Sequence, residues 1–363
     1  MYEQHITKQY RNKDISQKLI NKIKNISTKK ISLMEVCGTH TMSIFRHGIR
    51  SVLPENITLL SGPGCPVCVT SQKDIDIFIK LSTLKNVIIT TFGDLIKVLG
   101  SSSSLEKEKA KGKDIRIVYS VFDALEIAEN NKHKQVVFCS VGFETTTPTI
   151  ACCILMAQKR KISNFSIHSS NKITPPALLA LMKIKKINVN GFILPGHVSV
   201  ITGANAFKPV FEKYNISCVI AGFEPVDILE SILMLVQQNE LKTPLFKNAY
   251  KRVVDFNGNL KAKKIMNQVF ERTHANWRGL GVIHKSGMNL KKEFNEFNAL
   301  TRFQISVLEK KEPKQCICGE ILMGLKTPKD CILYKKKCTP FDPVGPCMVS
   351  TEGACAAFYK YNN

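Results

Sequence analysis

The chain has 363 residues, of which 44% are hydrophobic and 22% charged, a composition typical of a folded protein with two or three domains. It contains no run of about 18 apolar residues and no N-terminal signal-peptide core, so we expect a cytoplasmic protein that does not enter a membrane. In a reducing cytosol, 13 cysteines indicate metal or redox chemistry instead of a disulfide framework.

The formal net charge of +23 could indicate a nucleic-acid partner, because basic surfaces bind phosphate. However, the chain has 43 lysines and only 9 arginines, and the lysines are spread along the sequence without forming one basic arm. Arginine supplies the bidentate donors that recognise bases. The pattern therefore argues against nucleic-acid binding, and it is compatible with an acidic protein partner.

The first two predicted strands end in turns that carry cysteine. In "LMEVCGTHT", Cys37 stands at a strand tip beside a glycine, with His40 three residues later. In "ITLLSGPGCPVC", Cys65 and Cys68 follow a Gly- and Pro-rich loop, and a predicted helix comes after them. A thiol at a helix N-terminus has a lowered pKa, so we expect an exposed dithiol that is readily alkylated. The spacing of Cys65 and Cys68 also fits a thioredoxin-like dithiol or a soft-metal site.

Later segments repeat one pattern, an apolar β-branched run, a glycine-containing turn and a helix-like stretch. They cover residues 86–99, 135–149, 188–203 and 216–236. Such runs are typical of buried parallel strands, and their repetition predicts an α/β fold. The stretches "VGFETT" and "AGFEPV" lie 80 residues apart and indicate two similar halves. Residues 100–114, rich in Ser and Lys, are expected to form an exposed connection.

The tail of the chain holds six cysteines and too few apolar residues for a core of its own, so a metal centre is expected to stabilise it. Cys318, Cys331, Cys338 and Cys355 are separated by 12, 6 and 16 residues, and Cys316 and Cys347 are two further thiols. These spacings match neither a bacterial ferredoxin run nor a zinc ribbon, and both an iron–sulfur cluster and a zinc site stay open. The remaining cysteines lie in apolar contexts and are expected to be inert: Cys139, Cys152, Cys153 and Cys218.

Taken together, "MEVCGTHT", "SGPGCPVCVT", "GFETTTPT", "PGHVSVITG", "AGFEP" and "CTPFDPVGPCMVSTEGACAA" resemble the HypD family of hydrogenase maturation proteins, in motif order and along the whole chain. The resemblance implies assembly of the Fe(CN)2CO unit of nickel–iron hydrogenase, together with a HypC-type chaperone and a HypE-type cyanide donor. It also implies two similar Rossmann-like α/β domains with parallel sheets plus a C-terminal Cys-rich iron–sulfur domain. We place these domains at residues 1–130, 131–245 and 246–363.

The same resemblance assigns roles to individual residues. It implies that Cys37 binds the iron and that Cys65 and Cys68 form an electron-exchanging dithiol. For His40 it leaves two roles open, either a ligand or a residue beside the ligands that orients a group or supplies a proton. It implies a [4Fe-4S] cluster, for which we select Cys318, Cys331, Cys338 and Cys355, with Cys316 and Cys347 as possible replacements. Four residues at strand tips are expected either to line the cleft or to serve in capping and packing: Glu144, Thr145, Thr146 and His197.

Two other functions stay open from the sequence. One is an iron–sulfur-dependent thiol-disulfide oxidoreductase that turns over a substrate through Cys65 and Cys68. The other is a basic, metal-stabilised protein that binds nucleic acid. The assembly scaffold is the favoured hypothesis, because a thioredoxin-like motif does not normally come with a tail of six cysteines.

Overall fold

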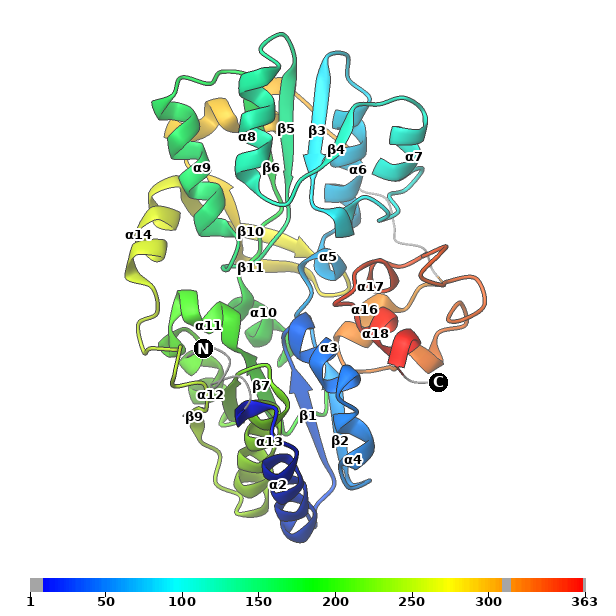
Figure 1. The fold of residues 1–363 in the computed structure, drawn as a ribbon, viewed down its shortest axis with the longest axis vertical. Helices are drawn as coiled ribbons and strands as arrows, with labels where there is room; N and C mark the ends of the chain where they lie inside the picture. The colour runs from blue at the N-terminus through cyan, green and yellow to red at the C-terminus, as the bar shows by residue number, and fades with distance from the viewer. Residues whose placement is uncertain (1–8, 309–314, 362–363) are drawn as a thin grey trace.

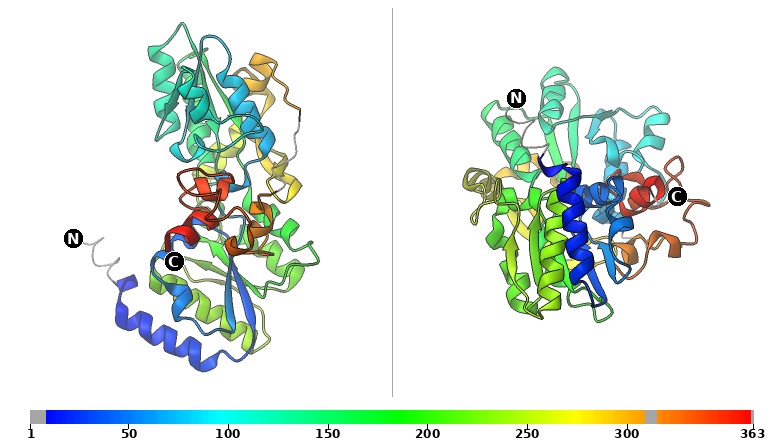
Figure 2. Two further views of the ribbon diagram at one scale, coloured as in Figure 1. Left: turned by 90° about the vertical axis from the view of Figure 1, so that its right-hand side faces the viewer. Right: turned by 60° about the horizontal axis from the view of Figure 1, so that its bottom comes forward.

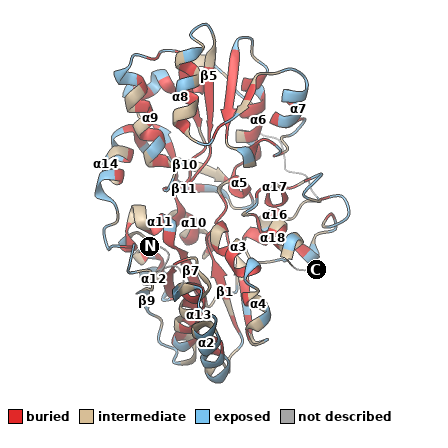
Figure 3. Ribbon diagram, viewed as in Figure 1, coloured by how far each residue is buried: buried red, intermediate tan, exposed pale blue. Residues whose placement is uncertain are grey.

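The structure is a computed structural model that describes residues 9–308 and 315–361. It contains two α/β domains, one above the other in Figure 1, and a tail segment beside the junction between them. Each domain has a parallel sheet, as the repeated strand–turn–helix pattern predicts. Figure 3 shows that the central strands of both sheets are buried.

The lower domain in Figure 1 contains a five-stranded parallel sheet. Its strand order is β2 (Ile57–Ser61), β1 (Ile31–Glu35), β7 (Gly191–Pro195), β8 (Ser217–Ala221) and β9 (Phe246–Asn248). Two of its helices, α2 and α13, lie side by side along the domain (Figure 2). The helical segments of this domain are α2 (Lys13–Ile26), α3 (Gly38–Arg46), α4 (Ile49–Val52), α10 (Thr174–Leu181), α11 (Gly196–Thr202), η2 (Ala204–Phe207), α12 (Lys208–Tyr214) and α13 (Pro225–Glu240).

The upper domain contains a four-stranded parallel sheet with the order β4 (Ile115–Ile117), β3 (Val87–Thr91), β5 (Gln135–Ser140) and β6 (Phe165–Ser169). Its helical segments are α6 (Gln72–Ser82), η1 (Gly93–Leu95), α7 (Leu105–Ala110), α8 (Val121–Asn130) and α9 (Thr147–Lys159). The predicted connection at residues 100–114 is not wholly exposed, because it includes α7, whose Leu105 and Glu108 are buried.

The predicted boundary at residue 130 does not separate the two sheets. Strands β1 and β2 pair in the lower sheet with β7, β8 and β9, whereas β3 and β4 pair in the upper sheet with β5 and β6. The chain crosses upward after β2, through the short helix α5 (Pro66–Val69), and returns downward after β6. Sequence order therefore misplaces the boundary, because each sheet combines strands from both of the predicted α/β ranges.

A two-stranded antiparallel hairpin forms backbone bridges to both of the segments that connect the two domains. It consists of β10 (Phe270–Trp277) and β11 (Gly281–Leu290), with an irregularity between Thr273 and Ala275. Isolated bridges join Thr70 of the upward crossing to Trp277, and Lys172 of the downward crossing to Gly287. Around the hairpin lie α14 (Leu260–Val269), η3 (Lys292–Phe297) and α15 (Ala299–Phe303). Residues 260–303 thus pack with the α/β domains, and within the predicted range 246–363 the Cys-rich segment is confined to the tail.

The tail contains four short helical segments and no strand among its described residues, 315–361. They are α16 (Cys318–Leu322), η4 (Pro328–Asp330), α17 (Pro346–Val349) and α18 (Ala354–Tyr361). Helix α17 packs against α5, and α18 packs against α3 (Figure 1). Over the whole described part of the chain, no helix is both long enough and apolar enough to span a bilayer.

Candidate functional site at the domain junction

Cys37 stands where the carboxyl end of β1 meets the first turn of α3, as the sequence predicts. It is the residue before the helix, and the backbone N–H groups of Thr39 and His40 point toward its sulfur. The thiol is 9% exposed and lines a cleft of about 520 Å³ between the two α/β domains. Burial and the nearby Glu352 carboxylate raise the pKa of Cys37 to about 12, although the amide donors lower it.

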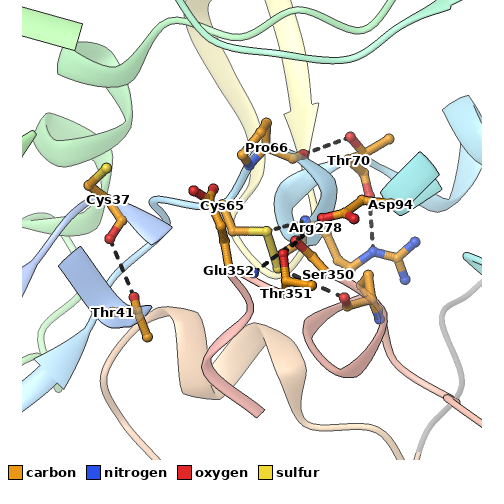
Figure 4. The surroundings of a disulfide bond; sticks show 12 residues. Cys37, Thr41, Cys65, Pro66, Thr70, Asp94, Arg278, Ser350, Thr351 and Glu352 are labelled. Carbon is orange, nitrogen blue, oxygen red and sulfur yellow. Dashed lines mark hydrogen bonds between the residues drawn. A yellow bond between two sulfur atoms is a disulfide. The ribbon is translucent and has the colours of Figure 1, made fainter. Parts of the chain in front are cut away.

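The loop that carries the Cys65–Cys68 pair lies directly on Cys37. The Gly38 N–H donates to the Gly64 carbonyl over 3.0 Å, and a Cβ at Gly64 would overlap the backbone nitrogen of Cys37. Only glycine permits this approach. The tips of β1 and β2 are therefore in contact, and Figure 4 shows Cys37 and Cys65 at the same junction.

Cys65 and Cys68 form a disulfide with a Cα–Cα distance of 5.2 Å. They are 3% and 0% exposed, so the expected exposure of the pair is wrong for this oxidised state, and ready alkylation of the reduced dithiol stays a prediction. Burial arises because α17 of the tail covers the loop: the Cys68 sulfur lies 3.9 Å from the carbonyl oxygen of Pro346. The predicted helix is present as α6, but it follows the single-turn helix α5 that contains the disulfide.

Glu352 is a site residue that sequence reasoning missed. Its Oε1 accepts a 2.7 Å hydrogen bond from the Thr39 hydroxyl, and its side chain lies over Gly38, where a Cβ would come within 2.5 Å of the Glu352 Cβ. Burial raises the pKa of Glu352. Thr39 and Glu352 are 313 positions apart, so no spacing within a motif connects them. The only signal is that Glu352 lies inside the tail motif "MVSTEGACAA".

His40 is fully buried and faces the lower sheet. Its Nε2 donates to the Gly222 carbonyl over 2.8 Å, which leaves Nδ1 as the unprotonated nitrogen. Nδ1 has no hydrogen-bond partner among the described residues. Burial lowers the pKa of His40 to about 4, so the ring is neutral at physiological pH. This favours an orienting role for His40 over the supply of a proton.

Phe223 connects His40 to the cleft. The rings of His40 and His197 stack on Phe223 at centroid distances of 4.5 and 3.8 Å. His197, from the first turn of α11, lines the same cleft as Cys37, and burial lowers its pKa. The "PGHVS" and "AGFEP" motifs thus form one aromatic stack beside the thiol.

The strand-tip residues after β5 divide between two cavities. Thr145 and Thr146 line the Cys37 cleft, as expected for residues at a carboxyl edge. Glu144 points instead to the other side, where its carboxylate accepts the backbone N–H and the hydroxyl of Thr174 at 2.9 and 3.0 Å. Glu144 therefore caps α10, which is the capping alternative that the sequence left open.

The tail thiols gather close to the disulfide. The sulfurs of Cys316 and Cys318 are 3.3 Å apart, and hydrogen bonds from Cys316, Cys347 and Cys355 lower the pKa of Cys318. Gly345 borders this group, since a Cβ there would lie 2.5 Å from the Cys318 sulfur. The Cys338 sulfur accepts the N–H of Val344. Among the described residues, no three His, Cys, Asp or Glu side chains are already arranged as a metal site.

The other cysteines are mostly where the sequence predicts. Cys139, Cys153 and Cys218 are buried in strands or a helix, and burial raises the pKa of each. Cys152 differs, because it is partly exposed on α9.

Comparison with known proteins agrees with this arrangement. A family model described as "HypD: Hydrogenase formation hypA family" matches residues 14–362. The hydrogenase maturation factor HypD2 of Bradyrhizobium diazoefficiens is 42% identical over an alignment of 363 positions, which covers 97% of this chain and 96% of that protein. The chain belongs to the HypD family. HypD of Azotobacter vinelandii is 42% identical and HypD of Escherichia coli 40%, each over 92% of this chain and 90% of the relative.

Membership of the HypD family gives the chain a role in hydrogenase maturation. The Cys37 cleft is lined by residues from motifs that lie far apart in the sequence. They follow β1, β2, β5 and β7 or belong to the tail.

Proposed function

We propose that, in the cytoplasm, this HypD-family chain is the scaffold on which the Fe(CN)2CO unit of nickel–iron hydrogenase is assembled, with Cys37 as its iron ligand. The observation that carries this proposal is the position of Cys37, a single thiol in a cleft of about 520 Å³, next to a disulfide and a group of tail thiols. No other thiol lines this cleft among the described residues.

The chemistry of the ligand supports this choice. Iron that carries CO and cyanide is soft and prefers thiolate. A bound metal displaces the thiol proton, so it can overcome the pKa of about 12, and the amides of Thr39 and His40 stabilise the resulting thiolate. A single protein ligand leaves positions on the iron for the diatomic groups and for a thiolate of a HypC-type chaperone. We propose a HypE-type protein as the cyanide donor.

The proposed electron supply uses the covered disulfide. Reduction of Cys65–Cys68 consumes two electrons and two protons and gives two thiols. The tail is in contact with this disulfide through Pro346, the residue before Cys347. We propose that Cys318, Cys331, Cys338 and Cys355 hold a [4Fe-4S] cluster, which supplies single electrons when bound. The soft, mutually hydrogen-bonded thiols fit such a group, and Cys316 is the alternative to Cys318 because the two sulfurs are 3.3 Å apart.

The test compares the wild-type chain with Cys37→Ala and with Cys152→Ala, which removes a partly exposed thiol outside the cleft. Each is co-expressed with the small chaperone, purified without oxygen and examined by infrared spectroscopy. We expect CO and cyanide bands in the wild type and in Cys152→Ala, and none in Cys37→Ala, which should keep its iron–sulfur visible absorption. Wild-type bands in Cys37→Ala would show that the iron is held elsewhere, with Cys65 or Cys68 the next candidates.

A second candidate function is an iron–sulfur-dependent thiol-disulfide oxidoreductase, which the disulfide beside the Cys-rich tail favours. The burial of both sulfurs argues against a bulky protein disulfide as substrate. Catalytic reduction of a small disulfide by the reduced chain, lost in Cys65→Ser, would support this alternative.

A further inference from the structure

A second polar pocket, apart from the Cys37 cleft and the tail thiols, lies at the carboxyl end of β6. It has a volume of about 310 Å³. Its walls come from the start of α6, the end of β6 with the loop that follows, and both strands of the hairpin (Figure 1). Ligands of open parallel sheets bind at this edge.

One wall of the pocket holds a buried carboxylate whose hydrogen bonds are satisfied. Asp74 accepts the hydroxyl protons of Ser71 and Ser170 at 2.7 and 2.9 Å, and the Nε2 of His168 lies 3.1 Å from its other oxygen. Burial opposes ionisation, but the hydrogen bond from His168 and the charge of Lys172 together hold the pKa of Asp74 well below its usual range. Asp74 is therefore a charged group that needs no further donor.

The ammonium of Lys172, in contrast to the Asp74 carboxylate, has no hydrogen-bond partner among the described residues. Its side chain is 3% exposed, and its Nζ is 3.9 Å from the nearer Asp74 oxygen, too far for a hydrogen bond. The Trp277 ring centroid is 5.9 Å from Nζ, and no described residue accepts a hydrogen bond from it. An ammonium carries three N–H donors, and Lys172 Nζ is not among the described buried atoms that are cut off from solvent without a partner, so its donors can reach a ligand in the pocket. Burial lowers the pKa of Lys172, and Asp74 partly restores it.

The remaining lining residues indicate the sign of a ligand that would use these donors. The pocket wall includes the exposed Lys73 and the imidazoles of His168 and His274, and its only acidic side chain is the already satisfied Asp74. We propose that this pocket binds a small oxyanion, a carboxylate or a phosphate compound, through the ammonium of Lys172. Its volume is about that of ten water molecules in the liquid, so it can hold a metabolite of a few heavy atoms.

A purely structural Asp74–Lys172 pair makes a different prediction. In that case removal of either charge lowers stability, and added anions bind no better here than elsewhere on a basic surface. Anion binding that depends on Lys172 but not on an exposed lysine outside the pocket separates the two explanations. Lys80 supplies that control, because it is an exposed residue of α6 that does not line the pocket, and its removal changes the net charge by the same amount.

The experiment titrates the full chain with inorganic phosphate and with malonate by calorimetry, at an ionic strength held constant with chloride. We expect saturable binding of at least one anion, and a dissociation constant at least about tenfold higher in Lys172→Met, which loses charge-assisted hydrogen bonds. Lys80→Met should stay within about twofold of the wild type. Phosphate alone would identify phosphate compounds, and malonate alone carboxylates.

A second measurement needs no variant and covers the case in which Lys172→Met fails to fold. Acylation of Lys172 in the wild-type chain, followed by peptide mass spectrometry, should slow when the binding anion is added, whereas acylation of Lys80 should change little. The proposal is overturned if neither anion binds saturably, if Lys172→Met binds as the wild type does, or if the anion leaves the acylation of Lys172 unchanged.

Discussion

At the scale of single residues, the groups around Cys37 shift the pKa of its thiol in opposite directions. Burial and Glu352 favour the thiol, whereas the α3 amides favour the thiolate. Below the thiol, the carboxylate of Glu35 accepts the Cys37 N–H at 3.2 Å and the Thr41 hydroxyl at 2.6 Å, which fixes the turn between β1 and α3. The thiol is thus held in place and protonated until a metal replaces the proton.

The charge of Glu352 should suppress the reactivity of the Cys37 thiol. Glu352→Gln removes the charge that opposes the Cys37 thiolate and keeps an acceptor for the Thr39 hydroxyl. The pKa of Cys37 should fall, and a fall of one unit multiplies the thiolate fraction about tenfold. Alkylation of Cys37 at pH 8 in iron-free protein, followed by peptide mass spectrometry, should quicken by about that order.

The control for this prediction is Glu55→Gln, which removes an exposed carboxylate at the opposite end of β2. It should leave the alkylation rate of Cys37 unchanged. Equal rates in the wild type and Glu352→Gln would mean that burial alone sets the pKa of this thiol.

At the scale of elements, the sequence predicts strands and their tips well, because these depend on neighbouring residues. The runs before "CGTH", "GFETT" and "PGHVS" are strands, and Cys37, Thr145 and His197 reach one cleft. The pairing of strands is not local: 157 positions lie between Leu33 of β1 and Gly191 of β7, the first residues that these two strands pair. Domain limits therefore could not follow from sequence order, and neither could the contact of Glu352 with Thr39.

The second prediction concerns the contact between β5 and α10. The pKa of Glu144 is raised by burial to about 7, above the ordinary value of 4.5, so the folded chain binds more protons than the unfolded chain between these pH values. The contribution of this group to stability is complete below pH 4.5 and is lost as the pH rises through 7. The loss amounts to as much as about 3 kcal/mol.

Glu144→Gln keeps an acceptor for the Thr174 N–H and does not titrate. Between pH 4.5 and 8, the urea midpoint of the wild type should therefore fall relative to that of Glu144→Gln. Measurement of both midpoints at several pH values isolates this group from the other titrating residues, which the two proteins share. Parallel curves would show that the carboxyl of Glu144 titrates normally.

At the scale of the whole molecule, the tail connects the two α/β domains. Glu352 accepts the Thr39 hydroxyl of the lower domain, and the neighbouring Ser350 hydroxyl donates to Asp94 of the upper domain over 3.0 Å. Pro346 covers the disulfide in the upward crossing. Figure 4 shows Glu352, Ser350, Thr351 and Asp94 around the disulfide. The tail thus forms a wall of the site. The position of Cys37 therefore depends on whether the tail is folded.

The last prediction tests what holds this wall. The tail has only short helices, and its buried apolar residues, such as Ile321, Leu322 and Met348, join the core of the α/β domains without forming a core of their own, so we expect a cluster bound by its thiols to add much of its local stability. Cys338→Ala should lose the bound iron, about four per chain for a [4Fe-4S] cluster, and its tail should be cut by protease while residues 9–308 stay resistant. Cys347→Ala should keep its iron and its resistance.

Comparison of Cys316→Ala with Cys318→Ala identifies the remaining ligand, since only the variant that lacks a true ligand loses iron. Full iron content in Cys338→Ala, or zinc in its place in the wild type, would contradict the assignment.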